Sequence, residues 1–343
     1  MGRRAAALAG VLAFALTGGC ILWSLQENKT HTRTLFAMDT VMLFTAQGPQ
    51  APEALEEALA EVRRLDALLS AQSPGSEISR LNDGGRAPVS EDTARLLKAA
   101  AEIGAETGGL YDCTVYPLME LWGFPTKAYR VPQAEEIAAL LPLVDGAQIR
   151  VTDDGAALGE GQRIDLGGIA KGYASARVME IFRARGVQSA MVTLGGNVQT
   201  LGERPEGGGW RIGVQDPLGG EACPAVIEAK DVAVVTSGGY QRYFEEDGKR
   251  YIHILDPRTG APAESDLLSA TVVSPDGTLA DALSTAVFVM GLEDAAAYWR
   301  THEGFELVLI AEDGTVYVTE GLERAVQAPA GRTVLLKEYI PLV

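Results

Sequence analysis

The stretch from Arg163 to Asn197 constrains this chain most, because it joins glycine-rich turns to one helix and one buried strand. Apolar residues recur at helical spacing in its middle part and predict an amphipathic helix: Ala174, Val178, Ile181 and Phe182. Gly186 ends this helix, and the β-branched and apolar residues 187–194 predict a buried strand. The stretch therefore predicts a turn, a helix and a strand in close succession.

The start of this stretch has the composition of an anion site. Asp165 is followed by the glycine pair Gly167 and Gly168, and then by Lys171 and Gly172. Glycines allow close backbone approach, a helix N-terminus offers free N–H groups, and the lysine adds positive charge. Neither GxxxxGK[ST] nor GxGxxG is present. The same residues also fit a tight loop-to-helix junction with a surface lysine.

Composition limits the classes of function. The chain has 343 residues, of which 47% are hydrophobic, and this is enough for one large core. A net charge of −17 argues against nonspecific nucleic-acid binding. Three histidines exclude a histidine-rich metal site, and the three cysteines lack zinc spacing. A hard cation held by oxygen ligands remains open.

The N-terminus predicts a targeting segment over residues 1–20. Arg3 and Arg4 precede the apolar run 5–19, which has the length of a signal-peptide core. The run ends in LTGGC, similar to a lipoprotein cleavage box with Cys20 as the lipidated residue. An uncleaved signal anchor is the alternative. Either one places the chain on the outer, periplasmic or extracytoplasmic face of the cytoplasmic membrane, with a linker at 21–33.

The remaining residues, 34–343, predict one α+β domain without internal repeats. Apolar spacing and caps predict helices at 52–70, 76–82, 90–106, 131–142 and 278–291. Strands are predicted at 34–45 (interrupted at 38–40), 210–216, 225–228, 232–236, 268–273, 307–310, 316–318 and 333–336, with hairpins at 149–156 and 240–254.

Three residues outside the organising stretch could carry chemistry. Asp281 and Thr285 lie four apart on a predicted helix, so both oxygens share one face and could bind Mg²⁺. Asp281 could equally be an acidic residue favoured near a helix start. His253, near a strand end, could be a general base or a structural histidine.

Taken together, the motifs resemble the ApbE family of FAD:protein FMN transferases. They occur in the family's order from about Met38 to Gly291: MDT, SEISRLN, GGLYDCTVYPLMELWGF, DLGGIAKGYA, GGN, TSGGY, HILDPRTGAP and DALSTAVFVMG. The resemblance implies a single T-fold-like domain that binds FAD and Mg²⁺. It further implies transfer of the FMN half of FAD to a threonine of an acceptor protein, with release of AMP. The acceptors of the family are subunits of membrane redox complexes.

The resemblance also implies roles for individual residues. Asp281, Thr285 and the main-chain carbonyl of Gly168 match the metal ligands, and His253 matches the base that deprotonates the acceptor threonine. Residues at positions that line the flavin nucleotide are Met38, Gln72, Leu110, Tyr111, Asp112, Asp165, Lys171 and Ile254.

Some positions depart from the family pattern. Gln72 stands where many members carry tyrosine, Asp39 replaces a common glycine, Tyr111 a common phenylalanine and Cys113 a common proline. The change at Gln72 bears on the balance between transfer and hydrolysis. Two other functions therefore stay open beside the transferase function: an FAD pyrophosphatase that gives FMN and AMP, and an FAD-binding lipoprotein without turnover.

Overall fold

A computed structural model describes residues 29–220, 222–329 and 332–337. The predicted signal segment, Cys20 and most of the predicted linker lie outside these residues. Within the described ranges, no helix has the length and apolar content that crossing a membrane requires. The first strand begins at Thr30, inside the stretch expected to be linker, so the folded domain starts four residues earlier than predicted.

The fold is built on one nine-stranded sheet with the order β1-β2-β6-β7-β10-β13-β14-β15-β17. Its strands pair antiparallel except for β15 and β17, which run parallel. The nine strands are β1 (Thr30–Ala37), β2 (Thr40–Gln47), β6 (Ala190–Leu194), β7 (Asn197–Leu201), β10 (Ala233–Gly238), β13 (Leu267–Ser274), β14 (Glu306–Ala311), β15 (Val316–Thr319) and β17 (Thr333–Leu336).

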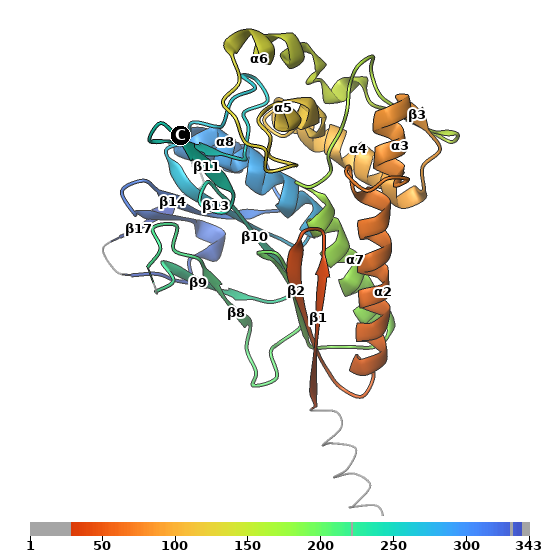
Figure 1. The fold of residues 1–343 in the computed structure, drawn as a ribbon. Coiled ribbons are helices and arrows are strands. Elements are labelled where there is room, and N and C mark those ends of the chain that lie inside the picture. The colour runs from red at the N-terminus through yellow and green to blue at the C-terminus, as the bar shows by residue number, and fades with distance from the viewer. Residues whose placement is uncertain (1–28, 221, 330–331, 338–343) are drawn as a thin grey trace, which may run out of the picture.

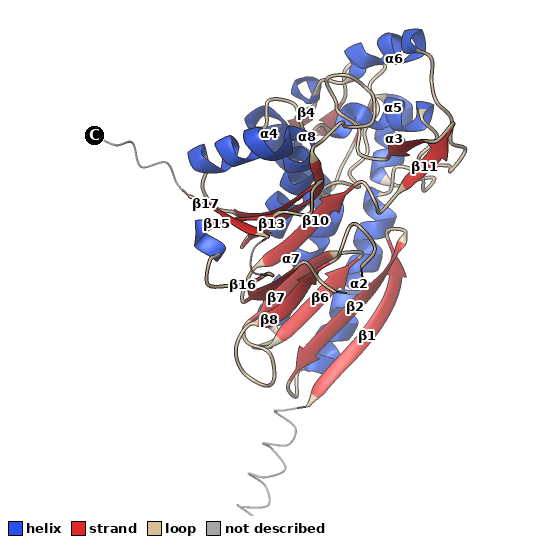
Figure 2. Ribbon diagram, turned by 90° about the vertical axis from the view of Figure 1, so that its left-hand side faces the viewer, coloured by secondary structure: helices blue, strands red, loops and turns tan. Residues whose placement is uncertain are grey.

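Helices cover one face of this sheet (Figures 1 and 2). The helices α2, α7 and α8 bury their apolar sides against the inward-facing strand residues, including Met42 and Phe44 of β2. The α-helices are α2 (Ala51–Leu69), α3 (Glu77–Gly84), α4 (Glu91–Glu106), α5 (Tyr116–Leu121), α6 (Ala134–Leu140), α7 (Ala170–Ala184) and α8 (Gly277–Thr301), with short 3-10 turns η1 (Cys113–Val115), η2 (Leu141–Leu143), η3 (Gly146–Gln148) and η4 (Glu320–Leu322).

A second, three-stranded sheet packs on the opposite face of the large sheet. It consists of β8 (Trp210–Val214), β9 (Ala225–Ala229) and β16 (Val326–Gln327). Its apolar residues form a separate core with Val234, Val273 and Val308 of the large sheet. The remaining strands form two small sheets: β3 (Arg86–Ala87), β4 (Arg150–Thr152) and β5 (Gly155–Ala157), and the hairpin of β11 (Tyr243–Glu246) and β12 (Lys249–Ile252).

The α+β class is confirmed, and two local features differ from expectation. The interruption at 38–40 is a hairpin turn, in which Met38 and Asp39 both adopt positive φ, so one predicted strand is two. The last helix continues past Gly291 to Thr301, with a kink at Gly291, whose φ is +76°. The glycine looked like a helix end because it favours this left-handed backbone, but the helix resumes after it.

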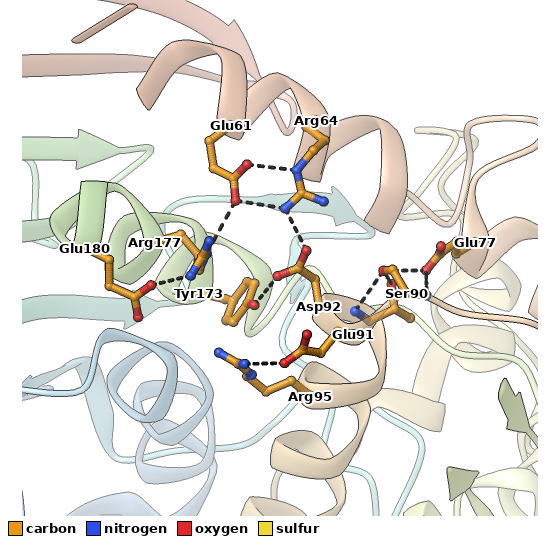
Figure 3. A network of polar contacts seen from close by, with 11 residues as sticks. Glu61, Arg64, Glu77, Ser90, Glu91, Asp92, Arg95, Tyr173, Arg177 and Glu180 are labelled. Carbon is orange, nitrogen blue, oxygen red and sulfur yellow. Dashed lines mark hydrogen bonds and ion pairs between the residues drawn. The ribbon is translucent and has the colours of Figure 1, made fainter. Parts of the chain in front are cut away.

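A polar network ties α2, α4 and α7 together (Figure 3). Arg64 of α2 bonds Glu61 at 2.8 Å and Asp92 of α4 at 2.6 Å. Tyr173 of α7 donates its hydroxyl to Asp92, and Arg177 contacts Glu61 at 3.4 Å. Hydrogen bonds from Arg64 lower the pKa of Glu61. The network therefore contributes stability that is present at neutral pH and lost as pH falls through the lowered pKa of Glu61.

Helices α7 and α8 approach each other closely at Gly172. A Cβ atom at residue 172 would lie 2.1 Å from the carbonyl oxygen of Gly277 and 2.6 Å from Cβ of Asp281. The Gly172 N–H donates to Oδ2 of the buried Asp281 at 2.8 Å. Only glycine permits this contact, which brings the start of α7 against Asp281.

We expect Gly172→Ala to destabilise the protein by about 1–3 kcal/mol or more, because the added methyl overlaps backbone that cannot rotate away. Gly84→Ala is the matched control: residue 84 also lies in a helix, with no atom within 4 Å of an added Cβ. Alanine should leave stability there unchanged or raise it by up to about 1 kcal/mol. Urea unfolding measures both, and equal stability of the two variants would contradict the close contact.

Candidate functional site

A cavity of 440 Å³ opens where the β1–β2 turn, the loop after α2 and the start of α7 meet. Four of the predicted nucleotide-lining residues lie in its wall: Met38, Gln72, Asp165 and Lys171. The other polar or charged side chains of its wall are Asp39, Asp66, Ser70, Ser73, Tyr116 and Arg242. The cavity thus joins segments that are far apart in sequence and that the motifs had marked separately.

Hydrogen bonds fix the cavity wall at two points. The Gln72 side-chain amide donates to the carbonyl of Pro125 at 3.4 Å, linking the loop after α2 to the loop after α5. The Lys171 ammonium donates to the carbonyl of Gly167 at 2.8 Å, which folds its chain back over the glycine turn. Lys171 therefore offers its remaining N–H groups to the cavity from a held position.

The formal charges around the cavity are mixed. Three carboxylates, Asp39, Asp66 and Asp165, face two cations, Lys171 and Arg242. Burial raises the pKa of Asp165, while the backbone N–H of Gly167 and the charge of Lys171 oppose that change. A strongly anionic ligand would meet more negative than positive formal charge here, so its binding calls for an added cation.

Gly168 and Thr285, two of the three residues predicted to hold a metal ion, lie close together behind the glycine turn. A Cβ atom at Gly168 would lie 3.9 Å from Oγ1 of Thr285 and 3.2 Å from the ring of Tyr111. Asp281 lies one helical turn before Thr285, and its Oδ2 is held by the N–H of Gly172. Oγ of Ser237, on β10, lies 3.5 Å from Oγ1 of Thr285. Three sequence segments thus meet at one point.

The donor set fits a hard cation. It contains one carboxylate, one hydroxyl and one carbonyl, which are the oxygen ligands that Mg²⁺ takes, with further positions left to water or phosphate. The ring of Tyr111 lies against Gly168, and its buried hydroxyl has no hydrogen-bond partner in the described ranges. No group of three or more His, Cys, Asp or Glu side chains suited to a metal occurs among the residues placed in the structure.

His253 lies just after β12, in contact with the chain before β11. Its backbone N–H donates to the carbonyl of Arg242 at 3.0 Å, and its Nδ1 lies 3.1 Å from the same oxygen. Because a carbonyl only accepts, Nδ1 carries the proton and Nε2 is left as an acceptor. Burial lowers the pKa of His253 to about 4, and the charges of Arg242 and Lys171 act in the same direction. The imidazole is therefore neutral at neutral pH.

Four predicted nucleotide-lining residues are not part of the cavity wall: Leu110, Tyr111, Asp112 and Ile254. Leu110 packs against the main core, and Ile254 is buried within it. Asp112 holds the backbone: one carboxylate oxygen accepts from the N–H of Thr114 at 2.8 Å, and the other from the N–H of Gly146 at 2.8 Å. These contacts position the loop that carries Tyr111. Direct contact of Leu110, Tyr111, Asp112 or Ile254 with a nucleotide remains a prediction.

Arg242 is a candidate residue that the sequence reasoning missed. It lines the cavity, its carbonyl holds His253, and its charge contributes to the low pKa of that histidine. The available signal was indirect: the predicted hairpin between Tyr240 and Ile254 has Arg242 near one end and His253 at the other. Antiparallel pairing brings such ends together.

We expect NMR titration of the imidazoles to show His253 neutral down to about pH 4, against about 6.5 in the unfolded chain. Since folding lowers this pKa, protonation favours the unfolded state, and His253 costs stability as pH falls from 6.5 towards 4. Arg242→Gln should raise the pKa of His253, because one opposing charge is removed.

Arg250→Gln is the matched control, since Arg250 lies on the same hairpin over the ring of Tyr243. It should leave the titration of His253 unchanged. The sequence holds only three histidines, so His253→Gln assigns the signal. A His253 pKa near 6.5 in the folded protein would contradict the half-buried, cation-flanked position.

Comparison with known proteins agrees with this geometry. The profile of the ApbE family matches residues 38–309. An FAD:protein FMN transferase from Treponema pallidum is 34% identical, over 82% of this chain and 83% of the relative. The crystal structure of an ApbE protein from Thermotoga maritima has a TM-score of 0.81 and 35% identity, covering 85% of this chain and 98% of that one.

A flavinyl transferase ApbE from Pseudomonas stutzeri, solved in its apo form, has a TM-score of 0.78 and 31% identity. That likeness covers 87% of this chain and 96% of that one. Sequence and structure therefore agree over nearly the whole length of these proteins. The chain belongs to the ApbE family.

Proposed function

We propose that this protein is a Mg²⁺-dependent FAD:protein FMN transferase, which moves the FMN half of FAD to a threonine of an acceptor protein and releases AMP. The observation that carries the proposal is one arrangement: a neutral His253 held by Arg242 of the cavity wall, and an oxygen-rich group formed by Gly168, Asp281 and Thr285 behind it. Relatives named FAD:protein FMN transferase, at 34% and 32% identity, support it.

The charges of the site suit a diphosphate. Lys171 and Arg242, both in the cavity wall, can pair with phosphate oxygens of FAD. The carboxylates Asp39, Asp66 and Asp165 oppose the same anion, so two basic side chains alone leave it under-neutralised. A Mg²⁺ ion held by Asp281, Thr285 and the Gly168 carbonyl would supply the missing positive charge and stabilise the phosphoanhydride as it breaks.

The transfer step uses His253 as the base. Nε2 accepts the proton of the acceptor threonine hydroxyl as its oxygen attacks the phosphorus of the FMN half. The new bond is a phosphoester between threonine and FMN, and the bond that breaks joins this phosphorus to the bridging oxygen of the anhydride. AMP leaves with that oxygen. Lys171 and Arg242 balance the charge that moves onto the leaving phosphate.

Water could replace threonine as the nucleophile, which would make the protein an FAD pyrophosphatase. Gln72 favours this second candidate, because its exposed side chain lines the cavity and is held only by a long hydrogen bond to Pro125. An exposed amide covers less of the cavity than a packed aromatic ring and so excludes water less well. The two activities share every group except the nucleophile.

The protein would act on the outer face of the cytoplasmic membrane, anchored by a lipid on Cys20. This part of the proposal is supported by the N-terminal sequence: a basic start, an apolar run and the LTGGC box. An acceptor in a membrane redox complex would then lie on the same surface as the enzyme. Anchoring both partners raises the effective concentration of each for the other.

The deciding experiment mixes the purified protein with FAD, Mg²⁺ and a flavin-acceptor domain bearing the candidate threonine. We expect AMP release together with covalent flavin fluorescence on the acceptor in a denaturing gel. AMP with free FMN and no labelled acceptor would identify the pyrophosphatase. Bound FAD without AMP would overturn both enzymes and leave a flavin-binding lipoprotein.

We expect Asp281→Asn to reduce AMP release at least about 100-fold, because the amide keeps an oxygen for the N–H of Gly172 but loses the charge that holds Mg²⁺. Thr285→Val should raise the Mg²⁺ concentration needed for half-maximal rate. Glu293→Gln, an exposed change on the same helix, is the control and should alter neither quantity. Unchanged turnover of Asp281→Asn at limiting Mg²⁺ would contradict the metal assignment.

A further inference from the structure

The outer face of the β1–β2 hairpin exposes an unusual group of apolar side chains. Phe36 is 70% exposed, Val41 is 62% exposed and Leu43 is 40% exposed. Phe36 pairs with Val41 across the two strands, and Leu43 follows Val41 on the same face. We call these three residues the hairpin patch. Large apolar side chains at such exposure, gathered on one strand pair, mark an interaction surface.

The hairpin patch continues a sheet face that is buried elsewhere. Strand register places Leu43 beside Thr193 of β6, Thr193 beside Val198 of β7, and Val198 beside Val234 of β10. Val198 and Val234 belong to the core beneath β8, β9 and β16. The three-stranded sheet does not extend over β1 and β2, so the apolar face emerges uncovered there (Figure 2).

The hairpin patch also reaches the cavity. Phe36 is a member of both, and Ala37, Met38 and Asp39, which follow it, also line the cavity. The opposite face of the hairpin is already used, since Leu35 and Met42 pack into the main core and Arg33 pairs with Glu56 of α2. An apolar surface therefore runs from the cavity mouth outwards along one face of the hairpin.

We propose that the hairpin patch docks the acceptor protein, by an apolar segment that flanks its acceptor threonine. The inference rests on the proposed function, because a protein substrate must place a hydroxyl in the cavity while the rest of its chain stays outside. The hairpin patch lies where the rest of the acceptor chain would leave the cavity.

The edge of the sheet suits an extended segment of that acceptor. In the described ranges β1 pairs only with β2, so the other side of β1 is a free strand edge. A strand added there gains main-chain hydrogen bonds, and its alternate side chains meet the same face as Phe36. Phe36, the seventh residue of β1, lies about 20 Å along the strand from Thr30, so the contact is made at the cavity end of the hairpin.

The test is the double variant Val41→Thr/Leu43→Thr, which places β-branched residues at both strand positions and leaves the cavity wall unaltered. We expect its affinity for the flavin-acceptor domain, measured by biolayer interferometry with FAD present, to fall about tenfold or more. The KM for the acceptor in flavin transfer should rise by a similar factor. FAD affinity and AMP release without acceptor should stay unchanged.

Leu218→Thr is the matched control, because Leu218 is 68% exposed between β8 and β9, away from the residues of the cavity wall. It should bind the acceptor like the unaltered protein. Equal acceptor affinity of the double variant, or no acceptor binding by the unaltered protein, would overturn the proposal. A change confined to self-association, seen by sedimentation, would assign the hairpin patch to a second copy of this chain and overturn it too.

The binding measurement distinguishes failure of the docking proposal from failure of the proposed function. If the acceptor binds but receives no flavin, the transferase assignment fails, and the affinity of the double variant still decides the docking surface. If the double variant transfers flavin with the same KM for the acceptor as the unaltered protein, the transferase assignment stands and the docking proposal fails.

Discussion

The contact between α7 and α8 at Gly172 is the constraint on which the site depends. The missing side chain lets the two helices approach until the N–H of Gly172 meets the carboxylate of Asp281 at 2.8 Å. This places Gly168 and Lys171, at the start of α7, against the helix that carries Thr285. A buried carboxylate is costly unless it is bonded. The hydrogen bond from the Gly172 N–H offsets part of that cost, and a bound cation would offset the rest.

The polar network then fixes the orientation of α7. Tyr173 and Arg177 lie one and five residues beyond Gly172, and they join Asp92 of α4 and Glu61 of α2 (Figure 3). Rotation of α7 about its axis would break these bonds and also move Lys171 out of the cavity wall. The network takes no part in the proposed reaction, yet it determines the position of the Lys171 side chain.

Local sequence signals were enough for most of the fold. The helix at 90–106 was predicted from its cap at Ser90 and the spacing of Leu96, Leu97 and Ile103, and α4 has these bounds. The pair Asp281 and Thr285 could be found because helical spacing alone puts them on one face. The turn at Met38 was harder to predict, because two non-glycine residues there adopt positive φ.

Local sequence signals did not predict the position of residues that depends on long-range contacts. Arg242 gains its place from the β11–β12 hairpin and from contact with His253. The sequence predicts the hairpin but does not predict that Arg242 lines the cavity. The oxygens of Asp112 accept hydrogen bonds from the N–H groups of Thr114 and Gly146, which the sequence does not predict, and contact of Asp112 with a nucleotide remains a prediction. A carboxylate in a glycine-rich loop serves either role, and only the fold shows which backbone groups lie within reach.

The charge pattern of the cavity explains why nucleotide and cation would bind together in the proposed function. Asp39, Asp66 and Asp165 repel a diphosphate, and Asp281 adds a further carboxylate beside the same glycine turn. A cation alone leaves the basic groups Lys171 and Arg242 unpaired, while the nucleotide alone meets the carboxylates. Each ligand therefore reduces the electrostatic cost of binding the other, and by linkage the coupling is equal in both directions. In the proposed function, an acid-lined cavity in a chain of net charge −17 would thereby favour a diphosphate that arrives with its cation over an anion that arrives without one.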